Sequence, residues 1–263
     1  MKKFIVSILA GIMVIFGVGT MSGCSFLDEA LDNAIDVELL EDEIETLEEE
    51  NKALKEELAS ELEELTSEND QLKEENQALK EELASLKFEL AFPNGLVTES
   101  CILNNVKVVR DVVNAEGSVY AVRADGEGVE VTINGGYYDA GSGSLYNIAV
   151  WAHHGSKVVI NGGEFVTGND VNGEFNHCIY AAGGSTIEVN GGTFMSNGDA
   201  SWLLNCQDGN GTIIVKGGTF VGFNPKDCVS EGEHTSFLAE GYDVVKETIN
   251  NVDYYTVIEV VVE

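Results

Sequence analysis

Three histidines lie where they could meet around a metal ion. His153 and His154 are adjacent in a turn that follows Trp151, and His177 lies in the next repeat of the same pattern. Imidazole nitrogen is the commonest protein ligand for transition metals. Unligated histidines in turns are far commoner than metal ligands, however. The sequence therefore favours no metal site and no bound cofactor.

Charged residues gather around Arg123, one of two arginines in the chain. Asp125, Glu127 and Glu130 follow it in one turn region. A polysaccharide lyase would need carboxylates to hold calcium and a basic residue to abstract a proton. Ordinary surface charge explains the group more simply, and no nucleophile elbow, phosphate loop or metalloprotease motif is present. We assign no catalytic residue; enzymatic activity stays open, with a non-enzymatic protein favoured.

Four cysteines remain after the one near the N-terminus: Cys101, Cys178, Cys206 and Cys228. An even number in an exported domain permits disulfides. Alignment of the glycine corners described below puts Cys178 opposite Leu204 and Cys206 opposite Tyr180. The two thiols are then out of register, so we expect buried free cysteines that fill space as small apolar side chains.

Four short apolar strands each run into the same corner. The corners read Asn134-Gly135-Gly136, Asn161-Gly162-Gly163, Asn190-Gly191-Gly192 and Lys216-Gly217-Gly218, and their first glycines are 27, 29 and 26 residues apart. A period in this range is typical of stacked-repeat folds. Two glycines permit a backbone corner with positive φ.

Each repeat also places particular side chains inside and at the corner. β-branched residues alternate with variable ones before the corner, which is the pattern of a half-buried strand. An aromatic residue follows each corner, and we expect these residues to stack inward: Tyr138, Phe165, Phe194 and Phe220. The corner asparagines could form a hydrogen-bonded ladder from coil to coil, which Lys216 would end.

A second strand precedes each corner, as in Ile148–Ala152. Coils of this kind, from Val97 to Gly222, resemble the right-handed parallel β-helix of pectin lyase-like proteins. The resemblance implies a mainly β fold with about 4–5 coils, here preceded by a long α-helical coiled coil. The C-terminal segment resembles the closing segment of repeat domains in bacterial surface and phage proteins, where a polar cap protects the last coil from aggregation.

The N-terminus has the layout of an export signal. Lys2 and Lys3 precede an apolar run from Phe4 to Met21, and Ser22-Gly23-Cys24 follows. This ending resembles the lipobox of bacterial lipoproteins, although Met21 stands where Leu is usual. The resemblance implies that Cys24 is lipidated and inserts in membrane lipid. An uncleaved membrane anchor is the alternative interpretation. Both interpretations place the rest of the chain outside the membrane, on the cell surface or in the envelope.

Leucines recur at heptad spacing from Leu40 to Leu90. Asn51, Asn69 and Asn76 take core positions, which favours a parallel two-stranded coiled coil. Glutamates and lysines at the flanking positions would pair between two such chains. The sequence therefore predicts a parallel homodimer on a coiled-coil stalk, with a trimer as the rival.

The chain is strongly acidic, with a net charge of −32. This charge argues against binding nucleic acid, anionic lipid or pectate. The predicted organisation is a lipoprotein signal peptide at 1–24, a coiled-coil stalk at 25–92, right-handed β-helix repeats at 93–230 and a C-terminal cap at 231–263.

Three classes of function fit these features. The leading one is a non-enzymatic surface lipoprotein for adhesion or carbohydrate contact, with a sugar-stacking face formed by Tyr137, Trp151, Tyr180 and Trp202. A polysaccharide lyase or hydrolase of the pectin lyase-like kind is the second. A phage-derived tail component is the third, and the lipobox argues against it.

The lipobox predicts the outcome of one substitution. Because the lipid would be attached through the thiol, Cys24→Ala should leave an unlipidated precursor or release the protein from the membrane fraction. Acyl labelling of the wild-type protein and the variant measures this directly. Equal labelling of the two would refute lipidation at Cys24.

Overall fold

The computed structural model describes residues 23–173, 177–207, 210–231 and 236–260. The predicted export signal lies outside this range. The backbone forms two compact units, Met1–Lys73 and Glu74–Glu263. Within the described ranges, no helix combines the length and the apolar composition that crossing a membrane requires.

The expected long coiled coil is wrong. The described residues contain a single α-helix, α2 (Gly23–Ala91), with no second helix packed along it. A coiled coil requires a facing helix whose holes receive the leucine side chains. Here the leucines of the heptad pattern are solvent-exposed, from 50% at Leu47 to 86% at Leu90. The oligomeric state stays a prediction of the sequence.

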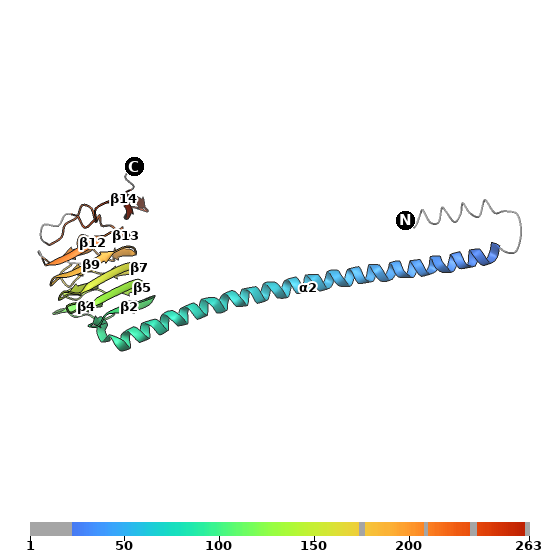
Figure 1. Cartoon of the computed structure of the whole chain (residues 1–263), viewed down its shortest axis with the longest axis horizontal. Coiled ribbons are helices and arrows are strands. Elements are labelled where there is room, and N and C mark those ends of the chain that lie inside the picture. The colour runs from blue at the N-terminus through green and yellow to red at the C-terminus, as the bar shows by residue number, and fades with distance from the viewer. Residues whose placement is uncertain (1–22, 174–176, 208–209, 232–235, 261–263) are drawn as a thin grey trace. The chain divides into compact units, whose positions relative to one another are not determined.

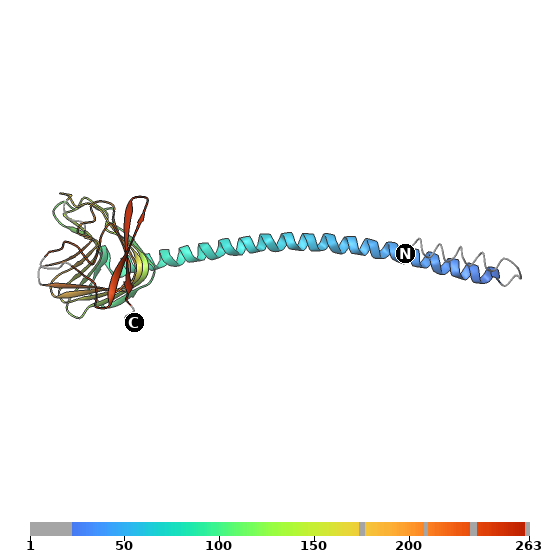
Figure 2. The ribbon, with the colours of Figure 1, turned by 90° about the horizontal axis from the view of Figure 1, so that it is seen from above.

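The second unit contains a β-solenoid of about four turns, as the repeats predicted. One sheet is parallel, in the order β1 (Leu96–Val97), β4 (Ser118–Asp125), β6 (Tyr146–His153), β8 (Ile179–Ala181) and β11 (Leu204–Cys206). The remaining strands of the coils belong to a second hydrogen-bonded sheet: β2 (Cys101–Leu103), β3 (Val106–Val109), β5 (Glu130–Asp139), β7 (Lys157–Thr167), β9 (Ser185–Val189), β10 (Thr193–Ser196), β12 (Gly211–Val215) and β13 (Thr219–Val221). The coils stack in chain order, and they overlap in the view from above (Figures 1 and 2).

The glycine corners bend β5 and β7, so that each of these strands belongs to two sides of the solenoid. The second glycine of every corner has a positive φ, between 100° and 118°. At Gly136, a Cβ atom would lie 2.1 Å from the carbonyl oxygen of Val106 in the coil below. Only glycine fits this corner, because both its φ and its close approach exclude a side chain.

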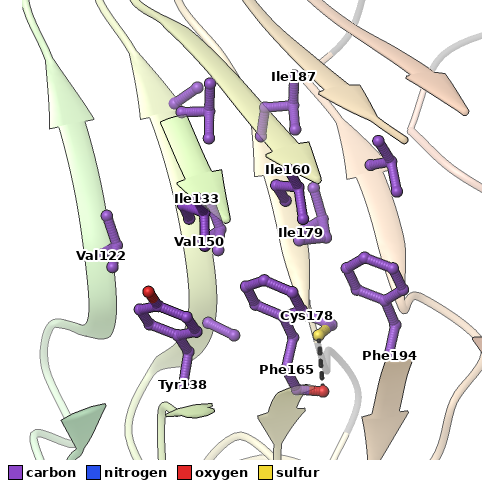
Figure 3. Close-up of a cluster of buried hydrophobic side chains, with 14 of the residues drawn as sticks. Val122, Ile133, Tyr138, Val150, Ile160, Phe165, Cys178, Ile179, Ile187 and Phe194 are labelled. Carbon is purple, nitrogen blue, oxygen red and sulfur yellow. Dashed lines mark hydrogen bonds between the residues drawn. The ribbon is translucent and has the colours of Figure 1, made fainter. Parts of the chain in front are cut away.

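The four aromatic residues after the corners form a stacked column inside the solenoid. The ring centroids of Tyr138, Phe165, Phe194 and Phe220 follow one another at 5.1, 4.9 and 4.8 Å, with interplanar angles of 12° or less. All four side chains are fully buried. Figure 3 shows three of these rings side by side, near the paired isoleucines Ile133 and Ile160 of neighbouring coils.

The corner asparagines form a ladder on the outside. Asn190 Nδ2 donates to Asn161 Oδ1 (3.0 Å), and Asn161 Nδ2 donates to Asn134 Oδ1 (2.8 Å). The ladder continues one step beyond the predicted set, because Asn134 Nδ2 donates to Asn104 Oδ1 (2.9 Å). Lys216 takes no part in it and donates to Glu188 Oε1 instead (2.8 Å).

Both ends of the solenoid are covered. At the start, Phe88 from the last turns of α2 is buried in the core, and Glu89 forms an ion pair with Arg110 at 2.8 Å. The 3-10 helix η1 (Pro93–Gly95) then leads into β1. At the other end, β14 (Tyr242–Ile249) and β15 (Val252–Glu259) form an antiparallel hairpin that pairs with β13. This hairpin is the red element nearest the viewer in Figure 2.

The cysteine register differs from the prediction by one residue. Cys206 pairs with Ala181 rather than with Tyr180, and Leu204 pairs with Ile179 rather than with Cys178. The reason is that the strand segments of these two coils are offset by 25 residues, whereas their glycine corners are offset by 26. All four cysteines are free, and Cys178 and Cys206 are buried.

Candidate functional site

A row of large side chains crosses the outer face of the sheet that contains β4, β6, β8 and β11. Strand register places Arg123, Trp151, Tyr180 and Asn205 at equivalent positions of successive coils. The Arg123 guanidinium carbon lies 4.1 Å from the ring centroid of Trp151. The ring of Trp151 lies 6.1 Å from that of Tyr180. This row, which we call the outer row, combines a cation–π contact with an aromatic pair.

A cleft of about 190 Å³ opens beside the outer row. It is lined by Ser118, Tyr146, Ile148, Trp151, His177, Tyr180 and Glu231. Glu231 comes from the segment that follows the last coil, and its Oε2 accepts a hydrogen bond from the Tyr180 hydroxyl (3.2 Å). Its backbone N–H donates to Asn205 Oδ1 (2.8 Å), which ties this segment to the outer row.

His177 forms part of the cleft wall, although only 3% of it is exposed. Its ring stacks on Tyr180 at 5.0 Å and on Tyr146 at 6.0 Å, and Nδ1 lies 3.4 Å from the carbonyl oxygen of Trp202. Burial lowers the pKa of His177 to about 4, although the nearby carbonyl oxygen and Asp170 oppose this shift. The imidazole is therefore neutral at physiological pH.

The structure brings together two of the four residues predicted for a ligand face. Trp151 and Tyr180 both line the cleft. Tyr137 belongs to β5 in the other sheet, where its hydroxyl donates to Asp139 Oδ2 (3.3 Å). Trp202 lies in the turn before β11 and is not among the residues that line the cleft.

The three histidines that the sequence analysis grouped together lie at two different positions in the structure. His177 is in the cleft, whereas His153 and His154 lie with Asp125 at the end of β4 and β6. The two Nδ1 atoms are 3.1 Å apart, and His154 Nδ1 is 2.6 Å from Asp125 Oδ1. Arg123 forms an ion pair with Asp125 Oδ2, and its Nη2 lies 3.3 Å from His153 Nδ1. We call Asp125, His153 and His154 the imidazole–carboxylate cluster; its three donor atoms lie within 4.8 Å of one another.

Electrostatics within the imidazole–carboxylate cluster favour an ionised carboxylate. Partial burial opposes ionisation of Asp125, but the hydrogen bond from His154 and the charge of Arg123 outweigh it, so the pKa of Asp125 lies below its usual value. Burial, His154 and Arg123 all lower the pKa of His153. The charge of Asp125 opposes this shift without reversing it, so the surroundings of His153 favour its neutral form.

Sequence reasoning missed two of these residues. Asp125 was treated as surface charge, yet the strand offset that pairs Arg123 with Trp151 also pairs Asp125 with His153. Comparison of the strand segments alone would have found this pairing. Glu231 lies in an irregular segment and reaches the cleft from 51 residues beyond Tyr180. No periodicity in the sequence signals that contact.

Buried neutral His177 should make stability depend on pH. Between its folded pKa of about 4 and an unfolded value near 6.5, the unfolded chain binds more protons, so the free energy of unfolding falls as pH is lowered through this window. The variant His177→Phe keeps an aromatic ring at this position, but the phenyl ring cannot take up a proton. The stability difference between the two proteins should therefore change by roughly 2–3 kcal/mol between pH 7 and pH 4.5. Urea denaturation at both pH values measures it, and parallel pH profiles would contradict it.

No protein-family model, curated protein or solved structure shows significant similarity to this chain. The assignment of function therefore rests on the geometry of the outer row, the cleft and the imidazole–carboxylate cluster.

Proposed function

We propose that this chain is an exported surface lipoprotein, anchored through Cys24, whose solenoid binds carbohydrate in the cleft beside Trp151. The solenoid would have the right-handed sense of pectin lyase-like proteins, and its role would be adhesion or glycan contact without catalysis. The observation that carries the proposal is the row of Arg123, Trp151 and Tyr180 next to a cleft.

Aromatic rings of this kind suit the apolar faces of sugar rings. A large flat side chain buries much apolar area and loses little conformational entropy on binding. Trp151 also carries an indole N–H for which no described residue supplies an acceptor. A buried donor without a partner costs about 1–3 kcal/mol, so a ligand hydroxyl that reached this N–H through a small movement of the indole would be stabilising there.

The rest of the cleft supplies polar groups at fixed positions. Ser118 and Glu231 offer a hydroxyl and a carboxylate, and His177 offers a neutral imidazole edge. Ligand sites typically combine apolar walls with a few such groups. The volume of about 190 Å³ is below the roughly 300–1,000 Å³ of pockets that enclose a drug-sized ligand. The cleft therefore suits one residue of a longer glycan.

The charge of the chain narrows the class of glycan. A net charge of −32 disfavours polyanionic chains such as pectate. Neutral glycans are therefore the expected ligands, and an array that contains neutral and acidic glycans tests this preference.

Trp151→Ala should weaken glycan binding by about 2 kcal/mol, or roughly thirtyfold, because the ring is the central apolar contact of the cleft. Trp202→Ala is the matched control, since this second tryptophan is not among the cleft-lining residues. Glycan-array and titration measurements on the full chain in detergent, with and without calcium, give the affinities. Equal losses in both variants would overturn the proposed cleft, and calcium-dependent release of unsaturated sugars would assign a lyase instead.

A further inference from the structure

We propose that Asp125, His153 and His154 form a binding site for a borderline first-row divalent cation such as Zn²⁺. This site is separate from the cleft, and it does not depend on glycan binding. Two imidazole nitrogens and a carboxylate oxygen are a ligand set that zinc commonly takes.

The backbone at His154 is what brings the two imidazoles together. Successive side chains of a strand point to opposite faces, so adjacent histidines in extended chain would diverge. His154 has a φ of 53°, in the left-handed region, and β6 ends at His153. This conformation turns both rings to the same side, where their centroids lie 3.7 Å apart.

The spacing of the ligand atoms shows why a cation fits. His154 Nδ1 lies 3.1 Å from His153 Nδ1 and 2.6 Å from Asp125 Oδ1, and the three potential ligand atoms all lie within 4.8 Å of one another. In the metal-free form, a single proton on His154 Nδ1 can serve both neighbours. A divalent cation would take its place, and the proton would move to His154 Nε2. The ligand atoms would then adjust by a few tenths of an ångström toward zinc distances of about 2.0–2.2 Å.

Arg123 holds the carboxylate of Asp125 in place without being a metal ligand itself. It binds Asp125 through Oδ2, whereas His154 faces Oδ1, so the two carboxylate oxygens have different partners. An outer partner of this kind orients a ligating carboxylate. On metal binding, His153 Nδ1 would exchange its contact with Arg123 for the cation. The guanidinium keeps its ion pair and its position over Trp151.

The side-chain exposure of the three residues fits a metal site that is open to solvent on one side. The side chain of His154 is 62% exposed, whereas those of Asp125 and His153 are 17% and 22% exposed. Water or a ligand atom would complete the coordination from the solvent side. Such a site takes up and exchanges its cation readily.

Calorimetric titration of Zn²⁺ into the full chain in detergent tests the proposal. His154→Asn removes the ligand nitrogen but keeps a residue that adopts positive φ readily. Because loss of an outer partner alone lowers metal affinity 10–100-fold, loss of this ligand should weaken Zn²⁺ binding at least tenfold. Glu127→Gln is the matched control, since it removes one exposed negative charge from the same turn and none of the three donors.

A second readout uses the tryptophan next to the cluster. The ring of His153 lies 5.3 Å from that of Trp151, so a bound Cu²⁺ or Ni²⁺ ion should quench its fluorescence. In Trp202→Phe, Trp151 is the only tryptophan, because the chain has two. We expect Cu²⁺ or Ni²⁺ to quench this fluorescence in the protein with His154 and not in His154→Asn. Ca²⁺ should neither quench the fluorescence nor displace the bound ion. Equal Zn²⁺ affinity in wild type and His154→Asn, equal losses in His154→Asn and Glu127→Gln, or effective competition by Ca²⁺ would each overturn the site.

Discussion

Hydrogen bonding between the backbones of successive coils is the constraint on which the rest of the solenoid depends. Parallel strands lie about 4.8 Å apart, so side chains at equivalent positions of neighbouring coils must meet. Inside, this spacing is close to the separation of 4.8–5.1 Å between the stacked rings of the aromatic column. Outside, the same register produces the asparagine ladder and the outer row. A slip of one residue would turn every inward ring toward solvent.

What could be predicted from the sequence follows from this regularity. The Gly-Gly corners repeat, so the column ending at Phe220 and the ladder ending at Asn190 could be predicted from spacing alone. Contacts that depend on irregular segments could not. The insertion of Phe88 into the first coil and the approach of Glu231 to Tyr180 carry no repeat signal. The leucines of α2 were misleading for a related reason, because a heptad pattern predicts a facing helix and the described residues contain no second α-helix.

Arg123 connects the two proposed sites. Its guanidinium lies over Trp151 beside the cleft, and it also forms an ion pair with Asp125 in the imidazole–carboxylate cluster. One side chain thus contacts both a wall of the proposed glycan site and a ligand of the proposed cation site. The two proposed sites therefore share one contacting side chain, and each has its own test.

If in-register contacts between neighbouring coils organise this protein, a double-mutant cycle on the free energy of unfolding should detect them as coupling energies. Leucine substitutions at Phe165, Phe194 and Phe220 keep apolar side chains in the core. The adjacent pair Phe165 and Phe194 should show a coupling energy of about 0.5–1.5 kcal/mol, because their rings are stacked. The pair Phe165 and Phe220, which Phe194 separates, should be additive within about 0.3–0.5 kcal/mol. Absence of coupling in the adjacent pair, or equal coupling in both pairs, would contradict the account.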